Sequence, residues 1–282
     1  MALPKNIVYP VDFSERCRAV WPSVVSMARQ LKAPVTILHV LDTEYLGLLE
    51  PTELDGIRAQ VRNKLQCFPA AELEISNVRR ELAEGSPASR IADRAAIMEA
   101  PLIMMPTRGH TRFRQLLLGS VTAAVLHDAD CPVWTDAHTN NNVLPTAVWH
   151  SIVCAIDMGP LTPGVLQAAS EFSKNTGASL HVVHSVPGID PRFPSGTADR
   201  AHQYLIDKAR EEFPGHCQKA GVTVPLEIVE DVGLINGIVG AIAKYKADLL
   251  VIGRGVIQGP LGRLRTNAHE LIRRSHCAVL SV

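Results

Sequence analysis

A loop in the first half of the chain combines the residue types that bind anions. It begins with the run Pro106–Gly109, continues for nine residues, and ends with Gly119-Ser120 before an expected helix. Glycines let main-chain atoms approach a phosphate closely, a serine hydroxyl can donate to a phosphate oxygen, and the free N–H groups of a helix start attract negative charge. The loop therefore predicts an anion site. The other interpretation is that Gly109 only permits a turn and that Gly119-Ser120 only cap a helix.

Two strand ends are expected beside this loop. Asp12 ends the first expected strand, and Val40-Leu41 ends the second. In an open parallel sheet, ligands bind beyond the carboxyl ends of the strands, where the strand order reverses. We therefore expect these residues and the loop to surround one crevice.

The elements that must position these residues follow from hydrophobic periodicity. Short β-branched runs alternate with amphipathic stretches, which is typical of a parallel sheet covered by crossover helices. In the first half, strands are expected at residues 6–12, 34–41, 77–83, 101–106 and 131–135, and helices at 14–32, 50–66, 87–99 and 119–129.

Local signals refine the helix boundaries. Ser86 before Pro87 and Thr162 before Pro163 are expected N-caps, each followed by proline in the first turn. Pro22 should kink the first helix or move its start to a later residue.

The chain contains two copies of this pattern. The run Asn6–Asp12 reappears as Ser151–Asp157 at an offset of 145 residues, and further landmarks follow in the same order. Because the offset of these landmarks varies by only three residues, we interpret the repeat as duplication of a whole domain. We expect one domain over residues 1–140 and a second over 147–282, with the polar stretch Asp136–Thr146 as the linker.

Composition excludes several classes of protein. The 28 basic and 28 acidic side chains give a formal net charge of zero, so no overall field favours nucleic acid. No apolar run approaches the ~18 residues that span a bilayer, and the N-terminal residues do not read as an export signal. The six cysteines are scattered singly without CxxC pairs, which favours a reducing compartment. We expect a cytoplasmic protein that binds neither nucleic acid nor membrane.

These residues resemble the universal stress protein family, and the resemblance covers both halves as a tandem pair. Its ATP-binding members carry Gly-x-x-Gly, nine residues and then Gly-Ser or Gly-Thr, together with an aspartate that ends the first strand and contacts adenine. Asp12, Gly109, Gly119 and Ser120 match this pattern. The resemblance implies an α/β fold of two tandem five-stranded parallel-sheet domains with helices on both faces, similar to the adenine nucleotide α-hydrolases.

The resemblance also implies that ATP is bound, and it leaves an accompanying Mg²⁺ open. The residues expected to bind nucleotide are Asp12, Val40, Thr107, Gly109, Gly119, Ser120 and Val121 in the first half, and Asp157, Gly253, Gly255, Arg265 and Thr266 in the second.

Each half departs from the family pattern. Pro106 replaces the first glycine of the motif, which removes an N–H group and adds a ring near the expected ligand. In the second half the glycines are one residue closer together, and Arg265 stands where the last glycine belongs. Arg263 and Arg265 could clamp a phosphate, or they could fill the cleft and pair with a carboxylate such as Asp157. The first half is therefore the favoured nucleotide site.

Three functions remain open at this stage. We expect a stress-response sensor or regulator that binds ATP and at most hydrolyses it slowly, since no general base faces a γ-phosphate. The alternative is a structural or interaction protein without cofactor, whose two clefts have both lost nucleotide. An adenylating enzyme is disfavoured because Asp12 is followed by Phe13-Ser14-Glu15 and not by a glycine-rich phosphate loop.

Partners follow from the resemblance alone. Family members pair their final strands across a dimer, which implies that residues 133–135 and 279–281 meet within one chain as an intramolecular pseudo-dimer. A homodimer of tandem chains and an unidentified protein partner stay open.

Histidines suggest a metal site that the pattern does not support. His39, His181 and His184 lie on or near expected strands, but a metal site needs several converging ligands. Alternation places His181 and His184 on opposite faces of the sheet. We expect core or edge histidines, no metal site and no catalytic residue.

Overall fold

The computed structural model describes residues 3–42, 50–69, 77–109, 118–137, 149–188, 197–231, 233–254 and 266–282. Within these ranges the chain divides into two compact units. The first half holds residues 4–136, and the second half holds the described residues from 149 onward. The expected linker lies mostly outside the described residues. Asp136, which was assigned to that linker, is instead buried in the first half with 2% of its surface exposed.

The first half alternates strands and helices as the periodicity predicts. Its strands are all parallel and lie in the order β3-β2-β1-β4-β5. The elements are β1 (Asn6–Pro10), α1 (Glu15–Leu31), β2 (Val35–Leu41), α2 (Pro51–Gln66), β3 (Val78–Glu84), α3 (Pro87–Ala96), β4 (Pro101–Met105), α4 (Ser120–Asp128) and β5 (Val133–Thr135).

The second half repeats this order. Its strands are again parallel and lie in the order β8-β7-β6-β9-β10. The elements are β6 (Ser151–Ile156), α5 (Thr162–Thr176), β7 (Ser179–Pro187), α6 (Thr197–Ala220), β8 (Leu226–Asp231), α7 (Leu234–Lys244), β9 (Leu249–Ile252), α8 (Thr266–Arg274) and β10 (Ala278–Ser281).

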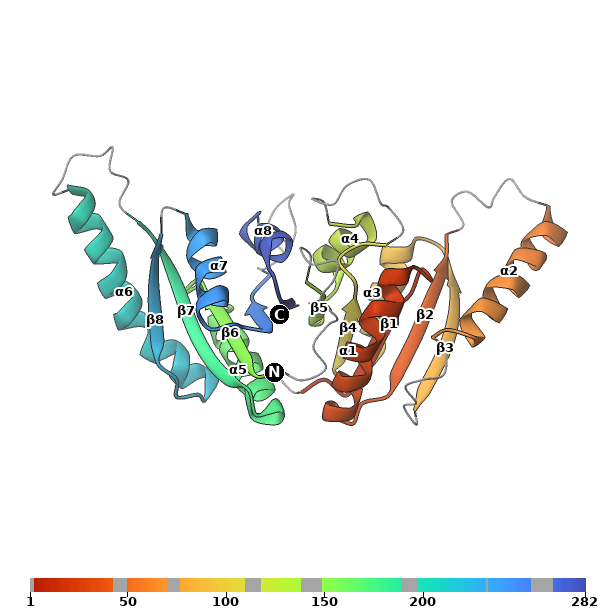
Figure 1. Ribbon diagram of the computed structural model, residues 1–282, viewed down its shortest axis with the longest axis horizontal. Helices are drawn as coiled ribbons and strands as arrows, with labels where there is room; N and C mark the ends of the chain where they lie inside the picture. Colours follow the sequence, from red (N-terminus) through yellow and green to blue (C-terminus); the bar gives the residue numbers. More distant parts are fainter. Residues whose placement is uncertain are drawn as a thin grey trace. The chain divides into compact units, whose positions relative to one another are not determined.

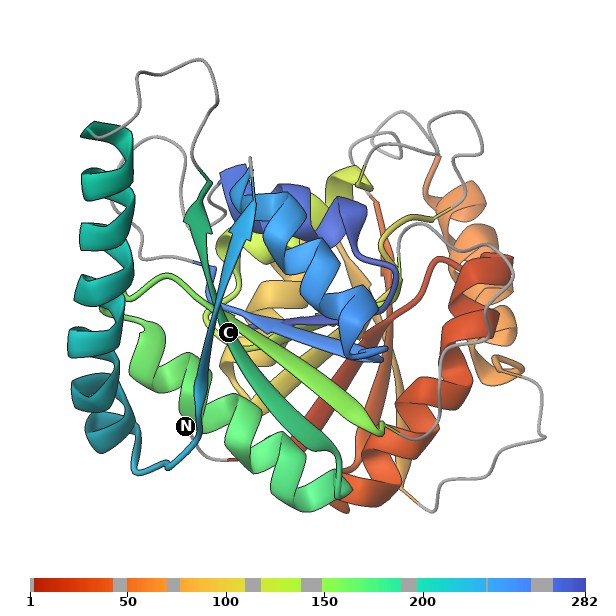
Figure 2. The same cartoon turned by 60° about the vertical axis from the view of Figure 1, so that its left-hand side comes forward.

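Strand order decides which helices share a face. Crossovers between parallel strands are right-handed, so two helices lie on the same face when their strands advance in the same direction. The chain moves outward from β1 through β2 to β3, then returns to the other side through β4 and β5. Helices α1 and α2 therefore cover one face of the first sheet, and α3 and α4, which pack on each other, cover the opposite face (Figure 1). In the second half, α5 and α6 lie on one side of the strands and α7 lies on the other (Figure 2). The predicted fold class is confirmed.

Burial of the central strands on both faces supplies the core. Ile7, Ile37 and Ile103 of the first sheet are fully buried, as are Ile152 and Leu250 of the second. Each such side chain contributes about 1.5–3 kcal/mol by leaving water. The continuous apolar runs of these strands thus have a direct structural cause.

Two predicted details are wrong, and one of two alternatives for Pro22 is excluded. Helix α1 begins at Glu15 and continues through Pro22, so the later start did not occur. The expected strand at 6–12 ends at Pro10 because the chain leaves the ladder there. Thr162 does not cap α5, since Leu161 is the N-cap residue and the Thr162 hydroxyl contacts Asp157.

Among the described helices, none is long and apolar enough to span a bilayer.

Candidate functional site

A pocket of about 260 Å³ opens where strand order reverses in the first half, beyond the ends of β1 and β4. The ends of β1, β2 and β4 and the starts of α3 and α4 form its wall. Six of the seven residues expected here line it: Asp12, Val40, Gly109, Gly119, Ser120 and Val121. Distant parts of the sequence are therefore brought to one cavity.

Asp12 is held in a fixed turn at the mouth of this pocket. Its Oδ1 accepts the main-chain N–H of Ser14 at 2.9 Å and the Cys17 thiol at 3.1 Å. Phe13, which follows it, adopts a left-handed conformation with φ of 64°. A non-glycine residue in that region costs of order 1 kcal/mol or more, so the surrounding packing must enforce this turn.

The same carboxylate lies directly against Gly109. A Cβ atom at position 109 would stand 2.1 Å from Asp12 Oδ2. A side chain at position 109 would therefore force the Asp12 carboxylate to move. Glycine is favoured here by this close approach and not by an unusual φ angle.

Thr107 anchors the base of the anion loop and does not line the pocket. Its N–H and hydroxyl both donate to Asp136 Oδ1, at 2.7 and 2.9 Å. The other carboxylate oxygen forms an ion pair with Arg16. Burial raises the pKa of the Asp136 carboxyl above its usual value, while Arg16 and Thr107 oppose that rise. Thr107 was predicted to contact the ligand, but its hydrogen-bonding groups face Asp136.

The start of α4 completes the anion side of the pocket. Gly119 is the N-cap residue and makes no side-chain capping bond. Its N–H donates to Thr107 O at 2.9 Å, which closes the base of the loop. The carbonyl of Pro106 accepts the Thr122 hydroxyl at 3.1 Å. Because the first N–H groups of a helix carry partial positive charge, this wall can accept an anion.

Arg108 adds a full positive charge to the same wall. Its side chain lines the pocket between Pro106 and Gly109. Burial, and secondarily the nearby charge of Arg16, lower the pKa of its guanidinium from the ordinary value. Sequence reasoning did not select Arg108, although its place inside the anion loop was an available signal.

His39 changes the end of the β1–β2 ladder. The paired register stops at Pro10 with Leu38, and Val11 N–H donates to Leu38 O at 2.9 Å. The next acceptor in the ladder, the Val11 carbonyl, is bonded by His39 Nδ1 at 2.7 Å. The donor that this carbonyl would otherwise take is the N–H of Val40. Among the described residues, no main-chain acceptor on β1 bonds that N–H.

The second half carries a larger pocket, of about 530 Å³, at the equivalent strand ends. Asp157 and Gly253 line it. Gly255 and Arg265 lie outside the described residues, and Thr266 is the first residue of α8. A Cβ atom at Gly253 would stand 3.1 Å from Val165 Cγ2, so this position favours glycine.

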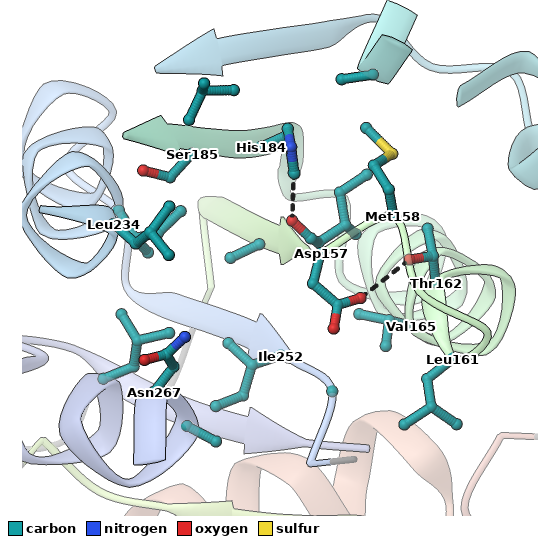
Figure 3. A pocket seen from close by; sticks show the side chains of 18 of the residues that line it. Asp157, Met158, Leu161, Thr162, Val165, His184, Ser185, Leu234, Ile252 and Asn267 are labelled. Atoms are coloured by element: carbon teal, nitrogen blue, oxygen red, sulfur yellow. Dashed lines mark hydrogen bonds between the residues drawn. The ribbon is translucent and has the colours of Figure 1, made fainter. Parts of the chain in front are cut away.

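Asp157 repeats the turn of Asp12. Its Oδ1 accepts the N–H of Gly159 at 2.8 Å. The same oxygen accepts the Thr162 hydroxyl at 3.4 Å (Figure 3). These partners stand two and five residues after the aspartate, as Ser14 and Cys17 do after Asp12. Met158 is left-handed, with φ of 57°. His184 Nδ1 bonds the Ile156 carbonyl at 2.9 Å, just as His39 bonds Val11.

His181 and Cys17 lie in surroundings that give each of them a structural explanation. His181 stacks on Tyr245 with ring centroids 3.7 Å apart, away from His184. Burial raises the pKa of the Cys17 thiol to about 12, which keeps it protonated. Within the described ranges, no three His, Cys, Asp or Glu residues are grouped to hold a metal ion.

Comparison with known proteins decides the family. The model of the universal stress protein family matches the chain twice, over residues 4–135 and 149–282. The chain belongs to the universal stress protein family. Within this family it is 31% identical over 137 residues to a universal stress protein of Methanocaldococcus jannaschii, which covers 46% of this chain and 81% of that protein.

Longer relatives match more of the chain. A universal stress protein of Mycobacterium tuberculosis is 23% identical over 206 residues, covering 66% of this chain and 68% of that protein. The crystal structure of a universal stress protein from Archaeoglobus fulgidus superposes with a TM-score of 0.67 and 22% identity, covering 98% of this chain and 95% of that one. The tandem universal stress protein fold is thus shared along the whole length.

Proposed function

We propose that the first half binds an adenine nucleotide, with ATP as the preferred ligand, and that the protein acts as a nucleotide-dependent regulator of stress responses. The observation that carries this proposal is the meeting of two opposite chemistries in one pocket. Asp12 and Val40, whose N–H bonds no described main-chain acceptor on β1, line the pocket at the strand ends, and the start of α4 without a side-chain cap lines the same pocket.

The two ends of the pocket match the two ends of a nucleotide. A carboxylate acceptor beside a main-chain donor complements the amino group and ring nitrogen of adenine. The start of α4, the Ser120 hydroxyl and the Arg108 guanidinium complement phosphate. A Mg²⁺ ion would accompany the phosphates as their charge partner.

Binding without rapid turnover suits this arrangement. The one carboxylate that lines the described wall is Asp12, and its Oδ1 already accepts two hydrogen bonds. Hydrolysis needs a group that orients water toward the γ-phosphate, and none of the described lining residues supplies one. Any hydrolysis would then be slow, and the liganded state itself would be the signal.

A second candidate is a nucleotide-free interaction protein. Pro106 lines the first pocket, and the cavity of about 260 Å³ is smaller than typical sites for drug-sized ligands, about 300–1,000 Å³. A ring in place of the motif glycine would shorten the space left for ribose and phosphate.

Calorimetric titration of the full chain with ATP, ADP, AMP and GTP tests the proposal. We expect ATP to bind, and we expect Asp12→Ala to weaken it at least tenfold while the protein stays folded. Gly119→Val should also weaken ATP, since it crowds the start of α4. The matched control is Asp157→Ala, which removes the equivalent carboxylate of the second half. Absence of heat with every nucleotide would favour the interaction protein.

A further inference from the structure

One end of each pocket is built from equivalent residues in the same arrangement. Asp157 and Asp12 make the same turn with the N–H group two residues later. His184 and His39 each bond the carbonyl just before that aspartate. These residues stand where the proposed function puts the base and sugar of a nucleotide, so the second half has kept that end of the site.

The other end differs in charge. Arg108 lines the first pocket, whereas Arg254, at the same place in the loop of the second half, is 3% exposed and does not line its pocket. Its main-chain N–H donates to Val282 O at 3.0 Å. The loop thus brings an arginine to the first pocket but not, within the described residues, to the second.

Helix α6 adds two charged side chains to the wall of the second pocket. Lys208 and Glu212 both line the second pocket, and the Lys208 ammonium lies 3.8 Å from Glu212 Oε1. With Asp157, the described wall carries two carboxylates and one ammonium that is already paired. The described wall of the first pocket has one carboxylate and one guanidinium, Asp12 and Arg108. Among the residues that the structure describes, a triphosphate in the second pocket would meet a net negative charge, which opposes it.

The size and the apolar lining of the second pocket also favour an uncharged ligand. The second pocket has about twice the volume of the first, 530 against 260 Å³. Its walls include Leu205 of α6 and Leu234 of α7, which are 42% and 37% exposed. Figure 3 shows Leu234, Ile252 and Val165 around the hollow with Asp157. Apolar walls of this kind bury a flat, uncharged ring system well.

We infer that the pocket of the second half binds an uncharged purine nucleoside, such as adenosine, and discriminates against its phosphorylated forms. The inference rests on the proposed function, because it takes the shared strand-end residues as the part that holds base and sugar. The two halves of one chain would then sense different chemical states of the same molecule, nucleoside and nucleotide.

Titration of the full chain with adenosine, AMP and ATP tests this inference. In the Asp12→Ala variant we expect adenosine to bind at one site, with AMP and ATP at least tenfold weaker there. Leu205→Trp, which adds bulk at the partly exposed wall, should abolish that adenosine site and leave ATP binding by the first half unchanged.

A charge reversal supplies a gain-of-function readout. Glu212→Lys should raise the affinity of the second pocket for AMP at least tenfold and leave adenosine affinity unchanged. The matched control is Glu211→Lys on the same helix, an exposed residue that does not line the pocket. It adds the same charge and should leave AMP affinity unaltered.

The outcomes separate the two proposals. If ATP fails to bind the wild-type chain while adenosine still binds the Asp12→Ala variant, the proposed function fails and the nucleoside site stands. If ATP fills both halves with similar affinity, or if adenosine does not bind the Asp12→Ala variant, the nucleoside site is wrong.

Discussion

The carboxylate of Asp12 occupies the space where a side chain at position 109 would begin. A Cβ atom on Gly109 would stand 2.1 Å from Oδ2 and 3.3 Å from Cγ of that aspartate. The Asp12 carboxylate therefore packs directly against the backbone of Gly109, in the space that a side chain at this position would need.

Replacing Gly109 by alanine should displace Asp12 and damage the proposed site. We expect ATP affinity to fall at least tenfold, with a loss of about 1–3 kcal/mol in the free energy of unfolding from the forced contact. Calorimetry and urea denaturation measure the two effects. Gly56→Ala is the control, since it meets no atom within 4 Å inside α2 and should stabilise by up to about 1 kcal/mol. Full ATP affinity in the Gly109 variant would show that Asp12 need not stay where it is.

The buried ion pair between Asp136 and Arg16 should matter strongly for stability. Asp136→Asn leaves Arg16, whose side chain is 17% exposed, without this counter-charge. Breaking a buried pair in this way costs about 3–5 kcal/mol, measurable by urea denaturation. Glu99→Gln removes an exposed pair with Lys5 and should cost less than about 1 kcal/mol. Equal effects of the two substitutions would mean that Asp136 is not the anchor described here.

His39 should make stability depend on pH below neutrality. Burial lowers the pKa of its imidazole from 6.5, and Lys64 adds to this, while the Val11 carbonyl and Asp12 oppose it. As pH falls below 6.5, the unfolded chain takes the proton first, so the free energy of unfolding decreases until the folded pKa is reached. At higher pH this contribution is fully present.

The variant His39→Asn tests that dependence. Its amide keeps a donor near the Val11 carbonyl but does not titrate, so the slope of stability against pH should flatten. His276→Asn changes an exposed histidine and serves as the control. An unchanged slope in the His39 variant would assign the pH dependence to other groups.

Thiol labelling should separate the cysteines by burial. Cys17 lines the first pocket, yet burial raises the pKa of its thiol to about 12. Since the thiolate is the reactive form, iodoacetamide at pH 8 should modify exposed Cys67 first and leave Cys17 unmodified in the folded protein. Peptide mass spectrometry reads each site. Rapid labelling of Cys17 would show that the pocket opens in solution and exposes this thiol.

Hydrophobic periodicity and the internal repeat predicted the fold, because both can be read directly from the order of residue types along the chain. The apolar run before Asp12 and its copy before Asp157 located the first strand of each half and the duplication, although β1 ends at Pro10. Parallel strands then had to bring those ends to one edge of each sheet. The two matches of the family model confirmed the duplication.

The hydrogen-bond partners of several side chains could be identified only from the tertiary structure. Thr107 turns to Asp136, which is 29 residues away, and Thr162 turns to Asp157 instead of capping its helix. Arg108 and Arg254 occupy equivalent loop positions, yet one lines a pocket and the other is buried. Hydrogen-bond partners and burial are set by which surfaces pack together, and local spacing does not encode that. The sequence by itself therefore located the two pockets near the strand ends, and packing decided which of the described charges line them.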